Sequence, residues 1–179
     1  MTILENAYTQ ALYSLAQQEN QTKHILQELS ALEESFRQVP EFLHLLASPN
    51  ISKQERFDII DQSFSRDFHP YVVNFLKVLT KNGHISCFLP CCQGFRAQYQ
   101  QEHNLLPVTA VTAVSLTDGQ KQKLCQTLSA ITGKEILLEN PTDPRVLGGI
   151  RLDYDGKRLE DTVQHRLESI RTALKSTTL

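Results

Sequence analysis

The spacing of apolar residues changes once along this chain, and that change restricts its fold more than any other feature. Up to Asn104 apolar residues recur every three or four positions, as on helices. From Leu106 the stretch LPVTAVTAV is rich in Val and Thr, which is typical of a strand. We therefore predict an α+β chain in two parts: a six-helix bundle over residues 1–105 and a smaller α/β module over 106–179.

The first part contains six segments with helical periodicity, joined by short connections. Ser52 and Glu55 form a capping box, which predicts the start of the fourth helix. The fifth, from about Pro70 to Asn82, has apolar residues on more than one side. Such a helix is buried on several faces or keeps one face for a partner. The sixth is predicted as one long helix from Ile85.

The second part predicts the order β-α-β-β-β-α. A capping box at Thr117 opens a helix that Gly133 ends. Strands are expected over 134–140 and 146–154, and the dipeptide Asp155-Gly156 predicts a hairpin to a strand over 157–159. The final helix carries one apolar stripe, formed by Val163, Leu167, Ile170 and Leu174.

Composition and charge exclude several classes of protein. The formal net charge is −2 and no run of like charge occurs, which argues against nucleic acid as a partner. No segment is long and apolar enough for direct membrane insertion, and the N-terminus lacks the pattern of a signal peptide. The four cysteines are not spaced as a disulfide framework, so a reducing compartment is expected.

The sequence predicts no catalytic, cofactor-binding or metal-binding residue. His84, Cys87 and Cys91 come nearest to a metal site, but a fourth ligand is not evident, and an ordinary half-buried cysteine cluster explains them. Cys125 has no evident base beside it. Gly148-Gly149 lacks the spacing of a phosphate-binding loop. An enzyme with a thiol or metal site around His84 remains open as an alternative.

Excess apolar surface on the first and fifth predicted helices is the feature left unexplained. Ala7 and Ala11 lie one turn apart and would let another helix approach closely, as in a helix-in-groove contact. Ordinary bundle core explains the same pattern, and periodicity alone does not separate the two. The residues assigned to this groove are Ala7, Tyr8, Ala11, Leu15, Val72, Phe75, Leu76 and Leu79.

Several motifs, taken in order, resemble those of one family. Near the start, the stretch from Tyr8 to Tyr13 is similar to a Tyr-Ala-x-Ala-Leu-Phe helix. Ser48-Pro49-x-Ile51-Ser52 resembles a Ser/Asn-Pro-x-Ile-Ser turn, and Asp143-Pro144 through Gly148-Gly149 resembles an Asp-Pro-x-Leu-Ile-Gly-Gly strand. Together they resemble the delta subunit of F-type ATP synthases, the family of the mitochondrial oligomycin sensitivity conferral protein. Five residues differ mildly from those usual at the same positions of the family: Thr9, Arg56, His84, Glu160 and Thr162.

The resemblance implies a non-catalytic stator subunit without cofactors, which couples proton-driven rotation to ATP synthesis. The bundle would bind N-terminal helices of alpha subunits of the catalytic head in the groove around Ala7 and Ala11. The module would bind the b subunits of the peripheral stalk through Val163, Leu167, Ile170 and Leu174. The resemblance further implies a peripheral position on the cytoplasmic face of the bacterial inner membrane. A general helical-bundle adaptor with unrelated partners is the alternative.

Overall fold

The computed structural model describes residues 2–48, 50–146 and 148–162 of the chain. The chain divides into two compact units, the first ending at Tyr99 and the second beginning at Gln100. This division lies a few residues before the expected boundary at 105/106 and falls within the last turn of the helix that ends at Glu102. The described strands all lie in the second unit.

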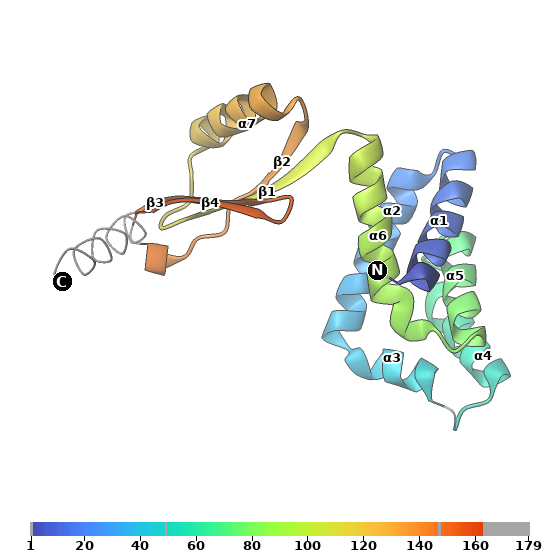
Figure 1. Ribbon diagram of the computed structural model, residues 1–179. Helices are drawn as coiled ribbons and strands as arrows, with labels where there is room; N and C mark the ends of the chain where they lie inside the picture. Colours follow the sequence, from blue (N-terminus) through green and yellow to red (C-terminus); the bar gives the residue numbers. More distant parts are fainter. Residues whose placement is uncertain (1, 49, 147, 163–179) are drawn as a thin grey trace, which may run out of the picture. The chain divides into compact units, whose positions relative to one another are not determined.

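The first unit is helical throughout its regular structure (Figure 1). Capping boxes begin two of its helices: Thr2 and Glu5 exchange hydrogen bonds at the first, and Ser52 and Glu55 at the fourth. These boxes satisfy backbone N–H groups that have no partner within the helix. The elements are α1 (Ile3–Gln18), α2 (Thr22–Gln38), α3 (Pro40–Ala47), α4 (Lys53–Phe64), α5 (Pro70–Lys81), η1 (Ile85–Cys87) and α6 (Phe88–Glu102).

The prediction of one long helix from Ile85 is wrong at its start. Residues Ile85–Cys87 form the 3₁₀ turn η1, and α6 begins at Phe88. Pro90 lies in the first turn of α6, where its missing N–H leaves no helical hydrogen bond unmade. The proline therefore marks where the α-helix proper begins.

The core of the first unit is built from aromatic and aliphatic side chains of every helix. Phe36 of α2 contacts three other rings: its ring centroid lies 5.6 Å from that of Phe42, 6.0 Å from that of Phe64 and 5.0 Å from that of Phe88. Tyr13 of α1 packs against Phe95 with ring centroids 4.9 Å apart. Aromatic pairs at these separations add to the stability gained from burial.

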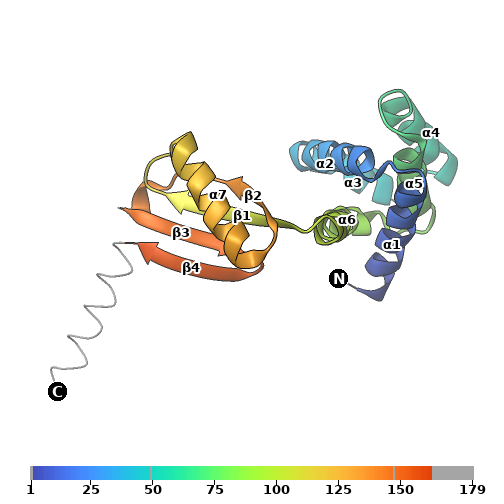
Figure 2. The same cartoon turned by 90° about the horizontal axis from the view of Figure 1, so that it is seen from above.

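The second unit is a four-stranded sheet in the order β2-β1-β3-β4, with α7 on one face (Figures 1 and 2). Strands β1 and β2 are parallel, whereas β3 is antiparallel to both β1 and β4. Thr117 caps α7, and Gly133 ends it at a φ of 68°, in the left-handed region that suits glycine. The elements are β1 (Leu105–Thr112), α7 (Asp118–Thr132), β2 (Glu135–Glu139), η2 (Pro144–Val146), β3 (Gly149–Tyr154) and β4 (Lys157–Thr162).

The predicted strand bounds differ most from the structure at β3 and β4. The strand expected from residue 146 begins at Gly149, because Pro144–Val146 forms the turn η2. The strand expected to end at Leu159 continues to Thr162, where it still pairs with Gly149. The final predicted helix lies outside the described residues. The helical first part and the sheet-containing second part that the sequence predicted are both present.

Candidate functional site

The α1 residues assigned to the groove lie on the surface of the first unit. Ala7 and Ala11 are exposed, Leu15 is 45% exposed, and Tyr8 is half-buried. Leu4 is 39% exposed and lies one turn before Tyr8, so it extends the same apolar stripe. The small side chains at Ala7 and Ala11 leave a strip of helix backbone open to close approach.

The α5 residues assigned to the groove lie mostly in the core. Val72, Leu76 and Leu79 are fully buried, and Phe75 is 7% exposed. Val78 is the large apolar side chain that α5 leaves exposed, at 44%. The sequence does indicate Val78 and Leu4, since each lies three or four positions from another apolar residue of the same helix.

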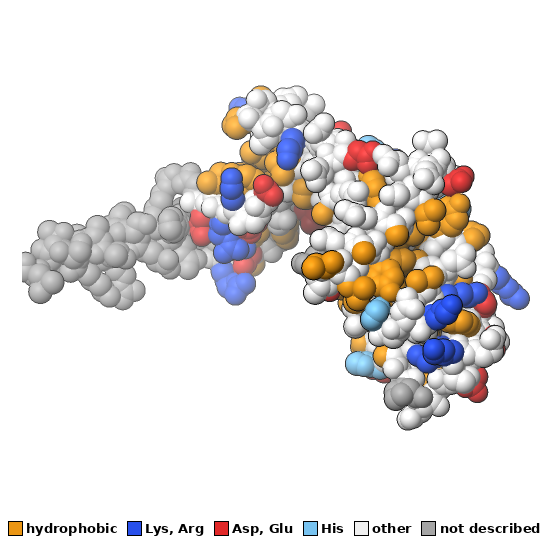
Figure 3. Space-filling model, turned by 45° about the vertical axis from the view of Figure 1, so that its right-hand side comes forward, with side chains coloured by type: hydrophobic (Ala, Val, Ile, Leu, Met, Phe, Trp, Pro, Cys, Tyr) orange, Lys and Arg blue, Asp and Glu red, His pale blue; other side chains and the backbone are white. Residues whose placement is uncertain are grey.

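A polar cluster joins α1 to the turn after α5, at the boundary of this surface. The Tyr8 hydroxyl accepts a hydrogen bond from Asn82 Nδ2 at 2.9 Å and lies 3.0 Å from His84 Nδ1. The Tyr8 ring also meets the Phe75 ring edge-on at 6.4 Å. These contacts place α1 beside α5. Figure 3 shows one face of the helical unit, where hydrophobic side chains gather into a patch with histidine nearby.

Two buried carboxylates tie α2 to other parts of the bundle. Glu33 forms ion pairs of 2.7 Å with Arg37 and with Arg96 of α6. Glu28 accepts a hydrogen bond of 2.8 Å from the backbone N–H of His69, the residue that precedes α5. Both carboxylates therefore serve as contacts between parts of the helical unit.

Two cysteines of the first unit, Cys91 and Cys92, pack in its core. Cys91 and Cys92 are buried, and burial raises the pKa of both thiols. A raised pKa disfavours the thiolate, which is the nucleophile and the metal ligand. Among the described residues, no group of three or more His, Cys, Asp and Glu is arranged to hold a metal ion. His84 instead contacts Tyr8.

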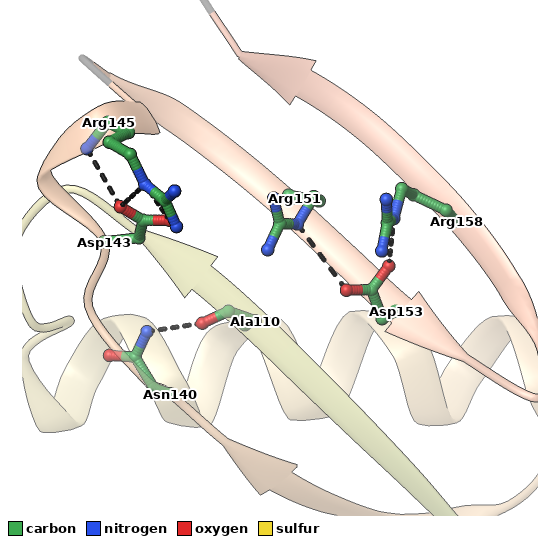
Figure 4. A network of polar contacts seen from close by, with 7 residues as sticks. All are labelled: Ala110, Asn140, Asp143, Arg145, Arg151, Asp153 and Arg158. Atoms are coloured by element: carbon green, nitrogen blue, oxygen red, sulfur yellow. Dashed lines mark hydrogen bonds and ion pairs between the residues drawn. The ribbon is translucent and has the colours of Figure 1, made fainter.

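On the second unit, the four residues assigned to the stalk lie outside the described residues. The sheet carries a row of ion pairs on the face opposite α7, where Asp153 lies 2.6 Å from Arg158 and 3.5 Å from Arg151 (Figure 4). Asp143 pairs with Arg145 beside the sheet. Within the described ranges, no helix has the length and apolar character needed to cross a membrane.

The comparisons with known proteins agree with one another. The family described as "ATP synthase delta (OSCP) subunit" matches residues 4–174. The ATP synthase subunit delta of Lacticaseibacillus paracasei is 30% identical over 168 residues, covering 93% of this chain and 92% of its own. That of Clostridioides difficile is 26% identical and covers 97% of both chains.

The fold is also that of a solved structure. A chain in the mitochondrial ATP synthase hexamer of Toxoplasma gondii superposes with a TM-score of 0.72 at 22% identity, over 97% of this chain and 98% of that one. The unrelated-adaptor alternative is not favoured by these matches. The chain belongs to the ATP synthase delta (OSCP) subunit family and is a non-catalytic stator component that links the head of the F-type enzyme to its peripheral stalk.

Proposed function

We propose that each unit of the chain holds a different partner. The first unit, acting as a six-helix bundle, binds N-terminal helices of alpha subunits of the catalytic head. The second unit binds the ends of the b subunits. As part of the ATP synthase complex, the chain then lies peripherally at the cytoplasmic face of a bacterial inner membrane. The observation that carries the head-binding part is the exposed apolar stripe of α1, which the helical core does not cover.

Three features of the α1 surface support an apolar helix as its ligand. Leu4, Ala7, Ala11 and Leu15 follow helical spacing and are all exposed. Val78 supplies apolar surface on α5, and the Tyr8 cluster fixes α1 against that helix. A groove held rigid before binding reduces the ordering cost of association. An amphipathic helix placed here would bury apolar residues at i, i+3, i+4 and i+7.

Ala11→Trp tests the head-binding surface. Since Ala11 is exposed, the indole should be accommodated without unfolding but should occupy the space of a bound helix. We expect binding of a peptide from the N-terminus of the alpha subunit, measured by calorimetry, to weaken by tenfold or more, about 1.4 kcal/mol. Ala31→Trp is the matched control, because Ala31 is an exposed alanine on α2. Equal affinity of the two variants would contradict the assignment of the α1 surface.

The stalk contact is proposed for Val163, Leu167, Ile170 and Leu174. Their apolar stripe suits a helix-to-helix contact with the b subunits. Leu167→Asp should weaken binding of peptides from the end of the b subunits while leaving the affinity for the alpha peptide unchanged. Because β4 extends to Thr162, a deletion intended to remove this contact must begin at residue 163 to leave the sheet intact. An unchanged affinity of the Leu167→Asp protein for the b-subunit peptides would contradict the proposed stalk contact.

A further inference from the structure

The sheet of the second unit has two chemically different faces. Side chains alternate between the faces of a strand, so the register assigns each residue to one of them. Leu152 pairs with Ala110 on one side and with Leu159 on the other, which places all three on one apolar face. The opposite face carries Arg151, Asp153 and Arg158. Figure 4 shows these charged side chains in front of the sheet and α7 behind it.

Helix α7 covers the apolar face unevenly. Over the central strand β1 the cover is complete, since Val108 and Ala110 are 1% and 0% exposed. On the edge strand β4, however, Leu159 is 54% exposed, and Ile150 and Leu152 on β3 are only half-buried. A strip of apolar surface over β3 and β4 therefore lacks a covering element among the described residues.

The topology brings the chain back to this strip. Strands β1 and β4 are each antiparallel to β3, so they run parallel to one another. Their last residues, Thr112 and Thr162, pair with the adjacent residues Ile150 and Gly149 of β3, and both strands thus end at the same edge. After β1 the chain turns back as α7 over the apolar face. Residues 163–179 follow β4 from the equivalent position.

The sequence of that segment matches the uncovered strip in chemistry and in length. Val163, Leu167, Ile170 and Leu174 fall on one side of a helix with about 3.6 residues per turn, and the other side is polar. From the first to the last of them such a helix rises about 17 Å. The six residues of β4 span about 17 Å as well.

We propose that, in the free subunit, residues 163–174 dock as a helix on the apolar face of the chain's own sheet, over Leu152 and Leu159 and beside α7. The charged face is excluded as the docking surface, because the apolar stripe of residues 163–174 would bury Arg151 and Asp153 against apolar side chains. This inference goes beyond the proposed partners and does not depend on them. A single stripe covers one surface at a time, so stalk binding through these four residues would require their release from the sheet.

Tryptophan fluorescence tests the docking in the full chain, which has no tryptophan of its own. Leu159→Trp places one reporter on the strip, and Leu137→Trp places a matched reporter on the opposite face, where Leu137 is 41% exposed and pairs with Pro107. Ile170→Asp, added to the first reporter, should shift its emission to longer wavelength and raise its quenching by acrylamide. Ser169→Asp, on the polar side of the segment, should change neither quantity.

The second reporter distinguishes docking from a general loosening of the sheet. With the Leu137→Trp reporter, Ile170→Asp should leave the emission wavelength unchanged. If the emission of both reporters shifts, the milder substitution Ile170→Ala replaces Ile170→Asp. Ile170→Ala should then shift the emission of the Leu159→Trp reporter and not that of the Leu137→Trp reporter. Emission from Leu159→Trp that ignores both substitutions overturns the proposal. A blue shift that grows with protein concentration overturns it too, because the occupant would then be a second copy. Head and stalk peptides are absent throughout, so failure here leaves the proposed function untouched.

Discussion

Tyr8 of α1 and His84, which follows α5, are 76 residues apart in sequence, yet the Tyr8 hydroxyl lies 3.0 Å from His84 Nδ1. The hydroxyl also accepts from Asn82 Nδ2, which leaves its own proton available to be donated to the imidazole. One phenol thus connects the N-terminal helix to the turn that ends α5. The contact fixes the separation of the two helices that border the proposed head-binding surface.

Tyr8→Phe should loosen this connection without removing the ring. The variant loses both polar contacts of the hydroxyl but retains the edge-on contact with Phe75. We expect the free energy of unfolding to fall by about 0.5–1.5 kcal/mol, as for the loss of a half-exposed hydrogen bond, with weaker binding of the alpha peptide. Urea denaturation and calorimetry measure the two effects. Tyr71→Phe is the control. If Tyr8→Phe has the same unfolding free energy and the same affinity for the alpha peptide as this control, the polar cluster contributes to neither stability nor binding.

Glu33→Ala should be among the more destabilising substitutions of a charged residue in the helical unit. It leaves Arg96, which is 38% exposed at its side chain, without its carboxylate partner, and removes the link from α2 to α6. Because both arginines can reach water, we expect a loss of about 1–3 kcal/mol in urea denaturation rather than the full cost of a buried unpaired charge.

Glu34→Ala is the matched control for that substitution. Glu34 is the next residue on α2, is exposed, and accepts a hydrogen bond from Gln38 within the same helix. Its replacement should change the unfolding free energy by less than about 0.5 kcal/mol. Equal losses for the two variants would mean that the contact between Glu33 and Arg96 is not a link between helices in solution.

Local signals in the sequence were sufficient for most helix and strand positions. The capping boxes at Ser52 and Thr117 and the glycine at 133 each act within one turn, so their effect is readable from neighbouring residues. The start of α6 was missed because a proline in the first turn of a helix does not interrupt the apolar spacing that predicted the helix from Ile85.

Contacts between distant residues were not readable in this way. Periodicity showed that α5 has apolar residues on several sides, but only packing decides that Val72, Leu76 and Leu79 face the core while Val78 remains exposed. The contact of Glu28 with the N–H of His69 joins residues 41 positions apart, and no spacing rule connects them. The strand order β2-β1-β3-β4 likewise depends on pairing across the whole second unit.

The ion pair between Asp61 of α4 and Lys77 of α5 should make stability depend on acid pH. Lys77 Nζ lies 2.6 Å from Asp61 Oδ1, and together with a hydrogen bond from Ser65 it lowers the pKa of Asp61. A lowered pKa in the folded state adds stability above the pKa of the unfolded chain, and that stability is lost as the pH falls through the folded value. Both side chains are partly exposed, so the gain at pH 7 is about 0.5 kcal/mol.

A double-mutant cycle isolates that contribution. Asp61→Asn, Lys77→Met and the double variant are unfolded in urea at about pH 7 and about pH 2.5, and the coupling energy should be present at neutral pH, smaller in about 1 M salt and absent in acid. A coupling that persists in acid would show that the interaction is not between charged groups.

The four free cysteines should react with a thiol reagent in two classes. Cys87 and Cys125 are half-buried, whereas Cys91 and Cys92 are 2% and 1% exposed, and burial raises the pKa of the latter two thiols. At about pH 8 the native protein should therefore be modified first at Cys87 and Cys125, and at the buried pair only as the helical unit opens. Mass spectrometry of iodoacetamide-treated protein measures the order. Urea below the unfolding transition should accelerate modification of Cys91 and Cys92 far more than that of Cys125, and rapid native labelling of Cys92 would contradict the packing of α6 in the core.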